Sequence, residues 1–302
     1  MFSINSNRYF FFILIFFISF HLKGQDKVKI AVWGDSRENL DNAISEAIAP
    51  VLLNKITDWD FQVHTGDFTH DGKEQSWQKS LNYSGISKLY VKNKFYLCSS
   101  NHDANDPKSI NNWDKHTAGI LPVNSADSTT HFYAVHKGNV NVVFLDGYFT
   151  KPEVMQKWLN RYLSKIDPND WLIAVWHAVS YGDLTYKESY LNVCQPWIDS
   201  LYNHGCKFIL NGHAHVYVRT KPLLPDESIN DKKGIVTIIN GTGGASWKEP
   251  VKQNPRIAFS PSETSFPTVT FLTFKGNSAH LETVDCRPGS NLKVIDQCEY
   301  QK

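Results

Sequence analysis

The sequence predicts an α/β fold, because short apolar runs alternate with helical patterns along its 302 residues. Eight runs predict strands: Val28–Trp33, Phe61–His64, Phe95–Cys98, Val140–Leu145, Trp171–Trp176, Lys207–Leu210, Ile235–Ile239 and Val269–Phe274. Four stretches predict helices: Leu40–Ile56, Glu74–Leu89, Glu153–Ile166 and Glu188–Asn203. No internal repeat and no linker rich in Pro, Gly or Ser divides the chain. Residues 26–302 are therefore expected to form one domain.

An N-terminal apolar segment predicts a signal peptide over residues 1–25. The run Tyr9–Phe20 is almost wholly apolar, follows Arg8, and precedes the small and polar residues Lys23 to Gln25. A membrane anchor is the alternative, but a spanning helix needs about 20 apolar residues, and this run is shorter. We therefore expect cleavage near Gln25. No cysteine lies nearby to carry a lipid, so the mature protein is expected to be secreted or periplasmic, without a membrane anchor.

The net charge gives no sign of a nucleic-acid-binding surface. The full chain carries +1 at pH 7. Residues 1–25 contain two basic residues and no acidic one, so removing them lowers the net charge to −1. A chain so close to neutral lacks the positive excess that binds nucleic acid or anionic membranes.

The five cysteines allow at most two disulfides in an exported protein. Cys286 and Cys298 lie close together in the polar C-terminal segment and are the favoured pair. Cys194 and Cys206 are a second candidate pair. Cys98 lies inside a predicted strand, where we expect a buried thiol.

Residues that commonly bind metals follow five of the predicted strands. They are Asp35, Asp67, Asn101 with His102 and Asp103, His177, and His213 with His215. Each alone has an ordinary explanation as a helix cap, a turn residue or a hydrogen-bonded histidine. Because the carboxyl ends of parallel strands meet at one edge of a sheet, the series as a whole predicts a shared site. Carboxylate, amide and imidazole groups are ligands of transition metals.

This series resembles the calcineurin-like metallophosphoesterases, whose blocks run GD, GD, NH[ED], H and GHxH. The resemblance spans about Lys29 to Gly244. Within that superfamily, Asn211–Thr220 (NGHAHVYVRT) resembles the GHxHxYER block of purple acid phosphatases. The stretches His131–Gly147 and Gly241–Ala245 are similar to the same subgroup. The resemblance implies a β-sandwich of two mixed sheets flanked by helices.

The resemblance also implies a site for two divalent or trivalent ions of Fe, Zn or Mn. Asp67 would bridge the ions, Asp35 and His215 would complete the shell of one, and Asn101, His177 and His213 that of the other. Asn101 would also face the substrate. One residue separates His213 from His215, so in an extended segment both would point to the same side.

Two residues of the third block are expected to take part in the reaction. By the same resemblance, His102 would protonate the departing alcohol oxygen. Asp103 would either orient the His102 ring by a hydrogen bond or serve only as a turn residue.

Two departures from the family pattern fall on candidate site residues. Arg37 stands where most members have a ligating histidine two residues after the first aspartate. It is a candidate for binding the substrate phosphate or for pairing with a structural carboxylate. Purple acid phosphatases have a tyrosine three residues after the bridging aspartate, whereas this chain has His70, which is either a replacement ligand or a solvent-facing histidine. Without that tyrosine, their colour should be absent.

We therefore expect a phosphatase that hydrolyses small phosphate monoesters through attack by a metal-bound hydroxide. A phosphodiesterase or nucleotidase with the same metal centre is the nearest alternative. A secreted scaffold that has lost turnover is a third possibility, motivated by the missing histidine of the first block. The polar loops Pro222–Lys233 and Asn254–Pro267 are candidates to border the substrate.

Overall fold

The computed structural model describes residues 27–124, 128–181, 184–185 and 191–302. The predicted signal peptide lies outside these residues, as does the expected helix start at Glu188. Within the described part, no helix is both long enough and apolar enough to cross a bilayer.

The first sheet has six strands in the order β13-β12-β11-β1-β2-β3. Its strands are β1 Val28–Trp33, β2 Phe61–His64, β3 Phe95–Leu97, β11 Thr268–Lys275, β12 Ser278–Asp285 and β13 Val294–Gln301. β1, β2 and β3 are parallel. β11 pairs antiparallel with β1, and β12 and β13 continue as an antiparallel meander.

The second sheet has seven strands in the order β10-β8-β9-β7-β6-β5-β4. Its strands are β4 Tyr133–Lys137, β5 Val140–Phe144, β6 Trp171–Val175, β7 Phe208–Asn211, β8 Tyr217–Thr220, β9 Val236–Asn240 and β10 Ile257–Phe259. β5, β6, β7 and β9 are parallel, and β4, β8 and β10 join as antiparallel neighbours.

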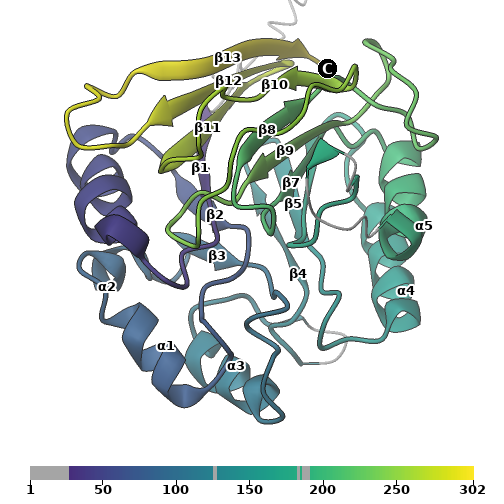
Figure 1. Cartoon of the computed structure of the whole chain (residues 1–302). Coiled ribbons are helices and arrows are strands. Elements are labelled where there is room, and N and C mark those ends of the chain that lie inside the picture. The colour runs from purple at the N-terminus through teal and green to yellow at the C-terminus, as the bar shows by residue number, and fades with distance from the viewer. Residues whose placement is uncertain (1–26, 125–127, 182–183, 186–190) are drawn as a thin grey trace, which may run out of the picture.

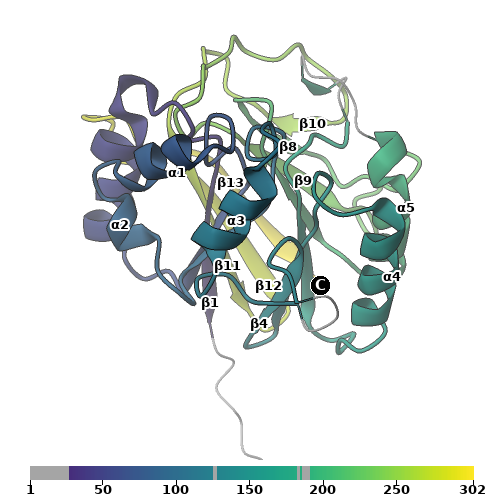
Figure 2. The same ribbon diagram turned by 90° about the horizontal axis from the view of Figure 1, so that it is seen from below.

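The two sheets pack together and helices cover their outer faces (Figures 1 and 2). Side chains of the second sheet alternate between two cores: Val142 and Ile173 pack in the core that includes the first sheet, whereas Val143 and Leu172 pack against α4 and α5. The helices are α1 Glu74–Leu81, α2 Ile86–Leu89, α3 Ser109–Thr117, α4 Pro152–Leu163 and α5 Leu191–Asn203. The expected arrangement of two mixed sheets between helices is confirmed.

Two predicted helices differ from the structure. The stretch Leu40–Ile56 forms a short 3₁₀ turn at Leu40–Asn42, followed by π-helical turns η2 Ala43–Ile48 and η3 Val51–Lys55. The stretch Glu74–Leu89 divides into α1 and α2 because Gly85 adopts a left-handed φ of 88°. Helix α3 and strands β4, β8, β10, β12 and β13 were not expected from the apolar runs.

The disulfide prediction is wrong for this structure, because all five cysteines are free. Cys298 faces Leu281 across the β12–β13 ladder, and Cys286 is buried just beyond the end of β12. Burial raises the pKa of the Cys286 thiol, as it does for Cys98. Both thiols therefore stay uncharged at neutral pH, and Cys98 is buried as expected.

Candidate metal centre

The predicted ligands leave the carboxyl ends of strands in both sheets. Asp35 follows β1, Asp67 follows β2, Asn101 follows β3, His177 follows β6, and His213 and His215 follow β7. Since β1, β2 and β3 are parallel, as are β6 and β7, these ends meet at a common edge of each sheet. Of the six side chains, only Asn101 is not fully buried.

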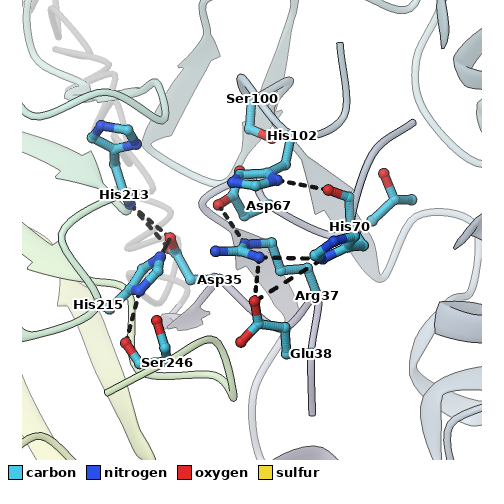
Figure 3. A network of polar contacts seen from close by, with 12 residues as sticks. Asp35, Arg37, Glu38, Asp67, His70, Ser100, His102, His213, His215 and Ser246 are labelled. Atoms are coloured by element: carbon cyan, nitrogen blue, oxygen red, sulfur yellow. Dashed lines mark hydrogen bonds and ion pairs between the residues drawn. The ribbon is translucent and has the colours of Figure 1, made fainter. Parts of the chain in front are cut away.

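Asp35, Asp67 and His215 form a group suited to one cation. One ligand atom from each lies within 4.8 Å of the others, and His215 Nε2 is 3.5 Å from Asp35 Oδ1. His215 Nδ1 lies 2.9 Å from the carbonyl oxygen of Ser246 and donates its proton there (Figure 3). The Nε2 lone pair therefore faces the carboxylates, as in histidines that bind metals.

A second group adjoins the first through Asp67. His177 Nε2 is 3.1 Å from Asp67 Oδ1 and 3.2 Å from His213 Nδ1. His177 Nδ1 lies 2.8 Å from the carbonyl oxygen of Thr65, so this nitrogen carries the proton. Two imidazole nitrogens at such a distance need a proton or a cation between them. Among the described residues, the buried Oδ1 of Asn101 has no hydrogen-bond partner, which fits the role of a metal ligand.

The electrostatics of the protein alone favour added positive charge. Burial raises the pKa of Asp35 to about 8. Burial opposes the charge of His177, but Asp67 and Asp35 outweigh it and raise the pKa of His177 to about 9. The same pairing with His177 holds the pKa of Asp67 well below its usual range despite burial. Asp35 and His177 thus retain protons at neutral pH that a bound cation would displace, whereas Asp67 is already ionised.

Four of the predicted ligands have left-handed backbone conformations. The φ angles are 58° at Asp35, 53° at Asp67, 68° at His213 and 52° at His215. Such angles are uncommon in residues other than glycine and gather at functional sites. The expectation of an extended segment from His213 to His215 is wrong, because the chain bends there and the Ala214 N–H donates to the Gly212 carbonyl at 2.8 Å.

Three glycines leave room for the ligands. A Cβ at Gly66 would lie 2.6 Å from His177 Nδ1, and the φ of Gly66 is 95°. A Cβ at Gly212 would lie 2.3 Å from Asp35 Oδ2, and one at Gly241 would lie 2.8 Å from the same atom. The glycines that precede or border the ligands are therefore required by close packing against ligand side chains.

His102 and Asp103 have separate tasks in the structure. His102 Nδ1 lies 2.6 Å from the carbonyl oxygen of His70 and donates to it (Figure 3). The buried Asp103 instead accepts hydrogen bonds from the Thr69 backbone N–H and hydroxyl, both at 2.8 Å, and from the Ser100 hydroxyl at 2.7 Å. Of the two alternatives for Asp103, orientation of the His102 ring is therefore wrong, and a role in the local turn agrees with these contacts. Asp103 fixes the loop that follows Asp67.

Arg37 is held against the site by three partners. Its Nε donates to Asp67 Oδ2 at 3.2 Å, and its Nη1 bonds the Glu38 carboxylate and lies 3.3 Å from His70 Nδ1 (Figure 3). The expected pairing of Arg37 with a carboxylate is thus present; its contact with phosphate stays a prediction. The His70 side chain is 58% exposed and lies outside the group of Asp35, Asp67 and His215, so its role as a ligand also stays a prediction.

The sequence did not reveal the buried polar contacts behind the ligands. His64, the last residue of β2, lies 2.9 Å from Ser36 Oγ and accepts from the Gly66 N–H at 3.3 Å. Its Nε2 therefore carries the proton. Burial lowers the pKa of His64 to about 3, so its ring stays neutral. A histidine within an apolar strand was the only signal for this contact.

Comparison with known proteins agrees with the expected resemblance. Residues 28–217 match the family model of the calcineurin-like phosphoesterases. Purple acid phosphatase 15 of Arabidopsis thaliana is 27% identical over 180 residues, which are 56% of this chain and 33% of that protein. This chain therefore spans about a third of the length of that relative.

Solved structures share the fold. Purple acid phosphatase PPD1 from yellow lupin (Lupinus luteus) has a TM-score of 0.71 at 16% identity, covering 92% of this chain and 54% of that one. GAP50, described as the anchor in the inner membrane complex of Plasmodium, has a TM-score of 0.63 at 16% identity, covering 91% and 89%. The family match includes more than half of this chain and every predicted ligand, so the chain belongs to the calcineurin-like phosphoesterase family.

Proposed function

We propose that this chain is an exported, metal-dependent hydrolase of phosphate monoesters. The observation that carries the proposal is the convergence of Asp35, Asp67 and His215 on one buried point, within 4.8 Å of one another. His177 and His213 adjoin Asp67 on the other side. This arrangement fits a pair of cations that share one carboxylate.

Two ions of the Fe, Zn or Mn type bound there would neutralise charge on the phosphate and lower the pKa of a bound water. The chain supplies the remaining functions. The carbonyl groups of Thr65 and Ser246 hold the ligand rings of His177 and His215 in place, so the site is formed before substrate arrives. Arg37 presents its planar guanidinium to the phosphate oxygens.

His102 gives a proton to the departing alcohol oxygen. Its Nδ1–H is engaged by the His70 carbonyl, so the proton that leaves is one that Nε2 has first taken up from solvent to form the imidazolium. Burial lowers the pKa of His102, so acidic conditions favour this form. The exposed side of the ring is the side on which a leaving group can lie, since His102 is not buried. A positioned acid of this kind contributes about 10²- to 10⁴-fold to the rate.

The reaction type is tested with two matched substrates. The purified protein, reconstituted with zinc, manganese or iron, is assayed on an aryl phosphate and on the corresponding bis-aryl phosphate. We expect a higher kcat/KM for the monoester. A strong preference for the diester would identify a phosphodiesterase instead.

The metal content of the purified protein distinguishes a hydrolase from a scaffold without turnover. Protein purified without chelator is analysed for bound transition metals. The hydrolase should hold close to two equivalents, or regain activity when metals are restored. Less than one equivalent, with no activity after reconstitution, would favour the scaffold.

The exported location rests on the apolar run Tyr9–Phe20 and its flanking residues. N-terminal sequencing of the protein recovered from the medium or the periplasm should give a chain that begins near Asp26. A protein that keeps its first 25 residues would contradict export by cleavage.

A further inference from the structure

A second hollow shares a wall with the metal centre. It has a volume of about 100 Å³, and the ring of His177 forms part of its lining. The Tyr148 ring lies opposite, with its centroid 6.3 Å from that of His177. Since His177 Nε2 also lies 3.1 Å from Asp67 Oδ1, the same ring borders both the metal centre and this hollow.

The rest of the lining is uncharged and largely apolar. Trp176, Ala178, Val193 and Trp197 are half of the lining residues, and the two indole rings meet edge to face with centroids 5.9 Å apart. Cys194 also lines the hollow, and burial raises the pKa of its thiol to about 12, so it carries no charge at neutral pH. Among the lining residues that the structure describes, none has a carboxylate and only His177 has a basic side chain.

The floor of the hollow is held rigidly. Asp146 accepts hydrogen bonds from the backbone N–H groups of Tyr148 and Phe149 at 2.8 and 3.1 Å, and from the Ser99 hydroxyl at 2.5 Å. These bonds fix the turn that carries Gly147 and Tyr148. A pocket formed before binding loses less free energy when it orders a ligand.

A larger hollow of about 800 Å³ lies elsewhere, under the loop of residues 250–262. Its lining includes Lys221 and Lys252 but none of the predicted ligands. Unlike the hollow beside His177, it therefore shares no residue with the metal centre.

We propose that the hollow beside His177 holds the apolar part of the substrate's alcohol, so that the preferred substrates are phosphate esters of small aromatic or short-chain apolar alcohols. This inference rests on the proposed hydrolase function and names its substrate class. An apolar cavity of about 150 Å³ is large enough for benzene, so a hollow of about 100 Å³ accommodates part of a ring or a short alkyl chain. Sugar and polyol phosphates would leave hydroxyl groups there without hydrogen-bond partners.

Binding of two phosphonates tests the pocket without requiring turnover. Phenylphosphonate and methylphosphonate cannot be hydrolysed and differ only in the group that would enter the hollow. Their Kd values are measured by calorimetry on the zinc-loaded protein. We expect phenylphosphonate to bind roughly tenfold more tightly, since even one extra methylene in an apolar pocket is worth about tenfold or more. Equal affinities would overturn the proposal.

Two substitutions place the effect in this hollow. A Cβ added at Gly147 would lie 3.7 Å from Trp197, an ordinary contact, so Gly147→Val fills the space without steric conflict at the backbone. It should abolish the preference for phenylphosphonate and leave the Kd of methylphosphonate unchanged. Val193→Thr should reduce the preference several-fold by replacing an apolar methyl group with a hydroxyl group. Equal weakening of both ligands by Gly147→Val, or no effect of Val193→Thr, would contradict the proposal.

The control is Val154→Thr on α4, which makes the same chemical change at a side chain of similar exposure, 46% against 44% for Val193. It should leave both Kd values unchanged. Failure of the pocket and failure of the hydrolase are distinguishable. If monoesters are hydrolysed but the two phosphonates bind equally, only the assignment of the pocket is refuted. If phenylphosphonate is preferred but no ester is hydrolysed, only the proposed hydrolase function is refuted.

Discussion

Replacing Arg219 by methionine should destabilise the protein by about 3 kcal/mol. Arg219 on β8 makes a two-point contact with Asp296 on β13, with both N–O distances at 2.7 Å. The Tyr217 hydroxyl donates to the same carboxylate at 2.7 Å. The side chains of Arg219 and Asp296 are only 12% and 4% exposed. Methionine keeps the apolar stem but leaves Asp296 buried without its charge partner, which costs about 3–5 kcal/mol; the partial exposure of Arg219 favours the lower end.

The assay is urea unfolding followed by tryptophan fluorescence, together with Tm. A loss of about 3 kcal/mol corresponds to a fall in Tm of roughly 6–12 °C. Lys115→Met is the control, because Lys115 and Glu74 form a pair at 2.8 Å with side chains 60% and 41% exposed, and such pairs contribute less than about 1 kcal/mol. Adding Asp296→Leu to Arg219→Met should recover most of the loss, since no unpaired charge remains. If Arg219→Met costs no more than the control, the reasoning from burial is refuted.

Three further predictions concern the metal centre. Asp67→Asn should lower kcat by at least about a hundredfold and release metal, because loss of the shared carboxylate affects both cations. His70→Ala should lower kcat by less than tenfold. If both variants lose metal and kcat equally, the ligands are misassigned. His102→Ala should keep its metal and slow esters of poor leaving groups most, and a matching loss of metal would identify it as a ligand. Finally, the pKa of His64 is lowered from 6.5 to about 3 in the folded protein, so its ring is neutral there. Between these two pH values the unfolded chain binds a proton at His64 that the folded chain does not. Lowering the pH therefore lowers the free energy of unfolding, by up to about 1.4 kcal/mol per pH unit. In chelator-treated protein, His64→Gln should flatten this dependence relative to the native chain; an unchanged slope would mean that the ring is protonated in the fold.

The sequence predicted the strands that deliver the ligands because those strands are buried on both faces. Continuous apolar runs such as Trp171–Trp176 stand out, and each ends at a polar residue that the fold brings to the site. β12 and β13 were missed because they lack continuous apolar runs: buried and half-buried residues alternate along most of β12, and most of β13 is half-buried or exposed. Their pairing depends on contacts between distant residues, and no local pattern reveals such contacts.

In the site too, the sequence predicted which residues take part but not the contacts between residues far apart in the chain. Residue types and their order predicted the positions of Asp35, Asp67 and the histidines. The bend at His213–His215 was not predicted, because left-handed angles at non-glycine residues are imposed by the surrounding fold. The structural role of Asp103 could not be predicted either, because its hydrogen-bond partner Thr69 lies 34 residues away in the sequence. The hollow beside His177 combines side chains from a turn after β5, a strand end and α5.

The position of the last strands has a practical consequence for anyone shortening the gene. The family match ends at residue 217, yet β9 lies between β7 and β8, and β11 borders β1. An expression fragment trimmed to the matched segment would lose an internal strand of one sheet and expose the flank of β1 in the other. Such a fragment should be recovered as insoluble material, so biochemical work on this protein requires all the strands through β13.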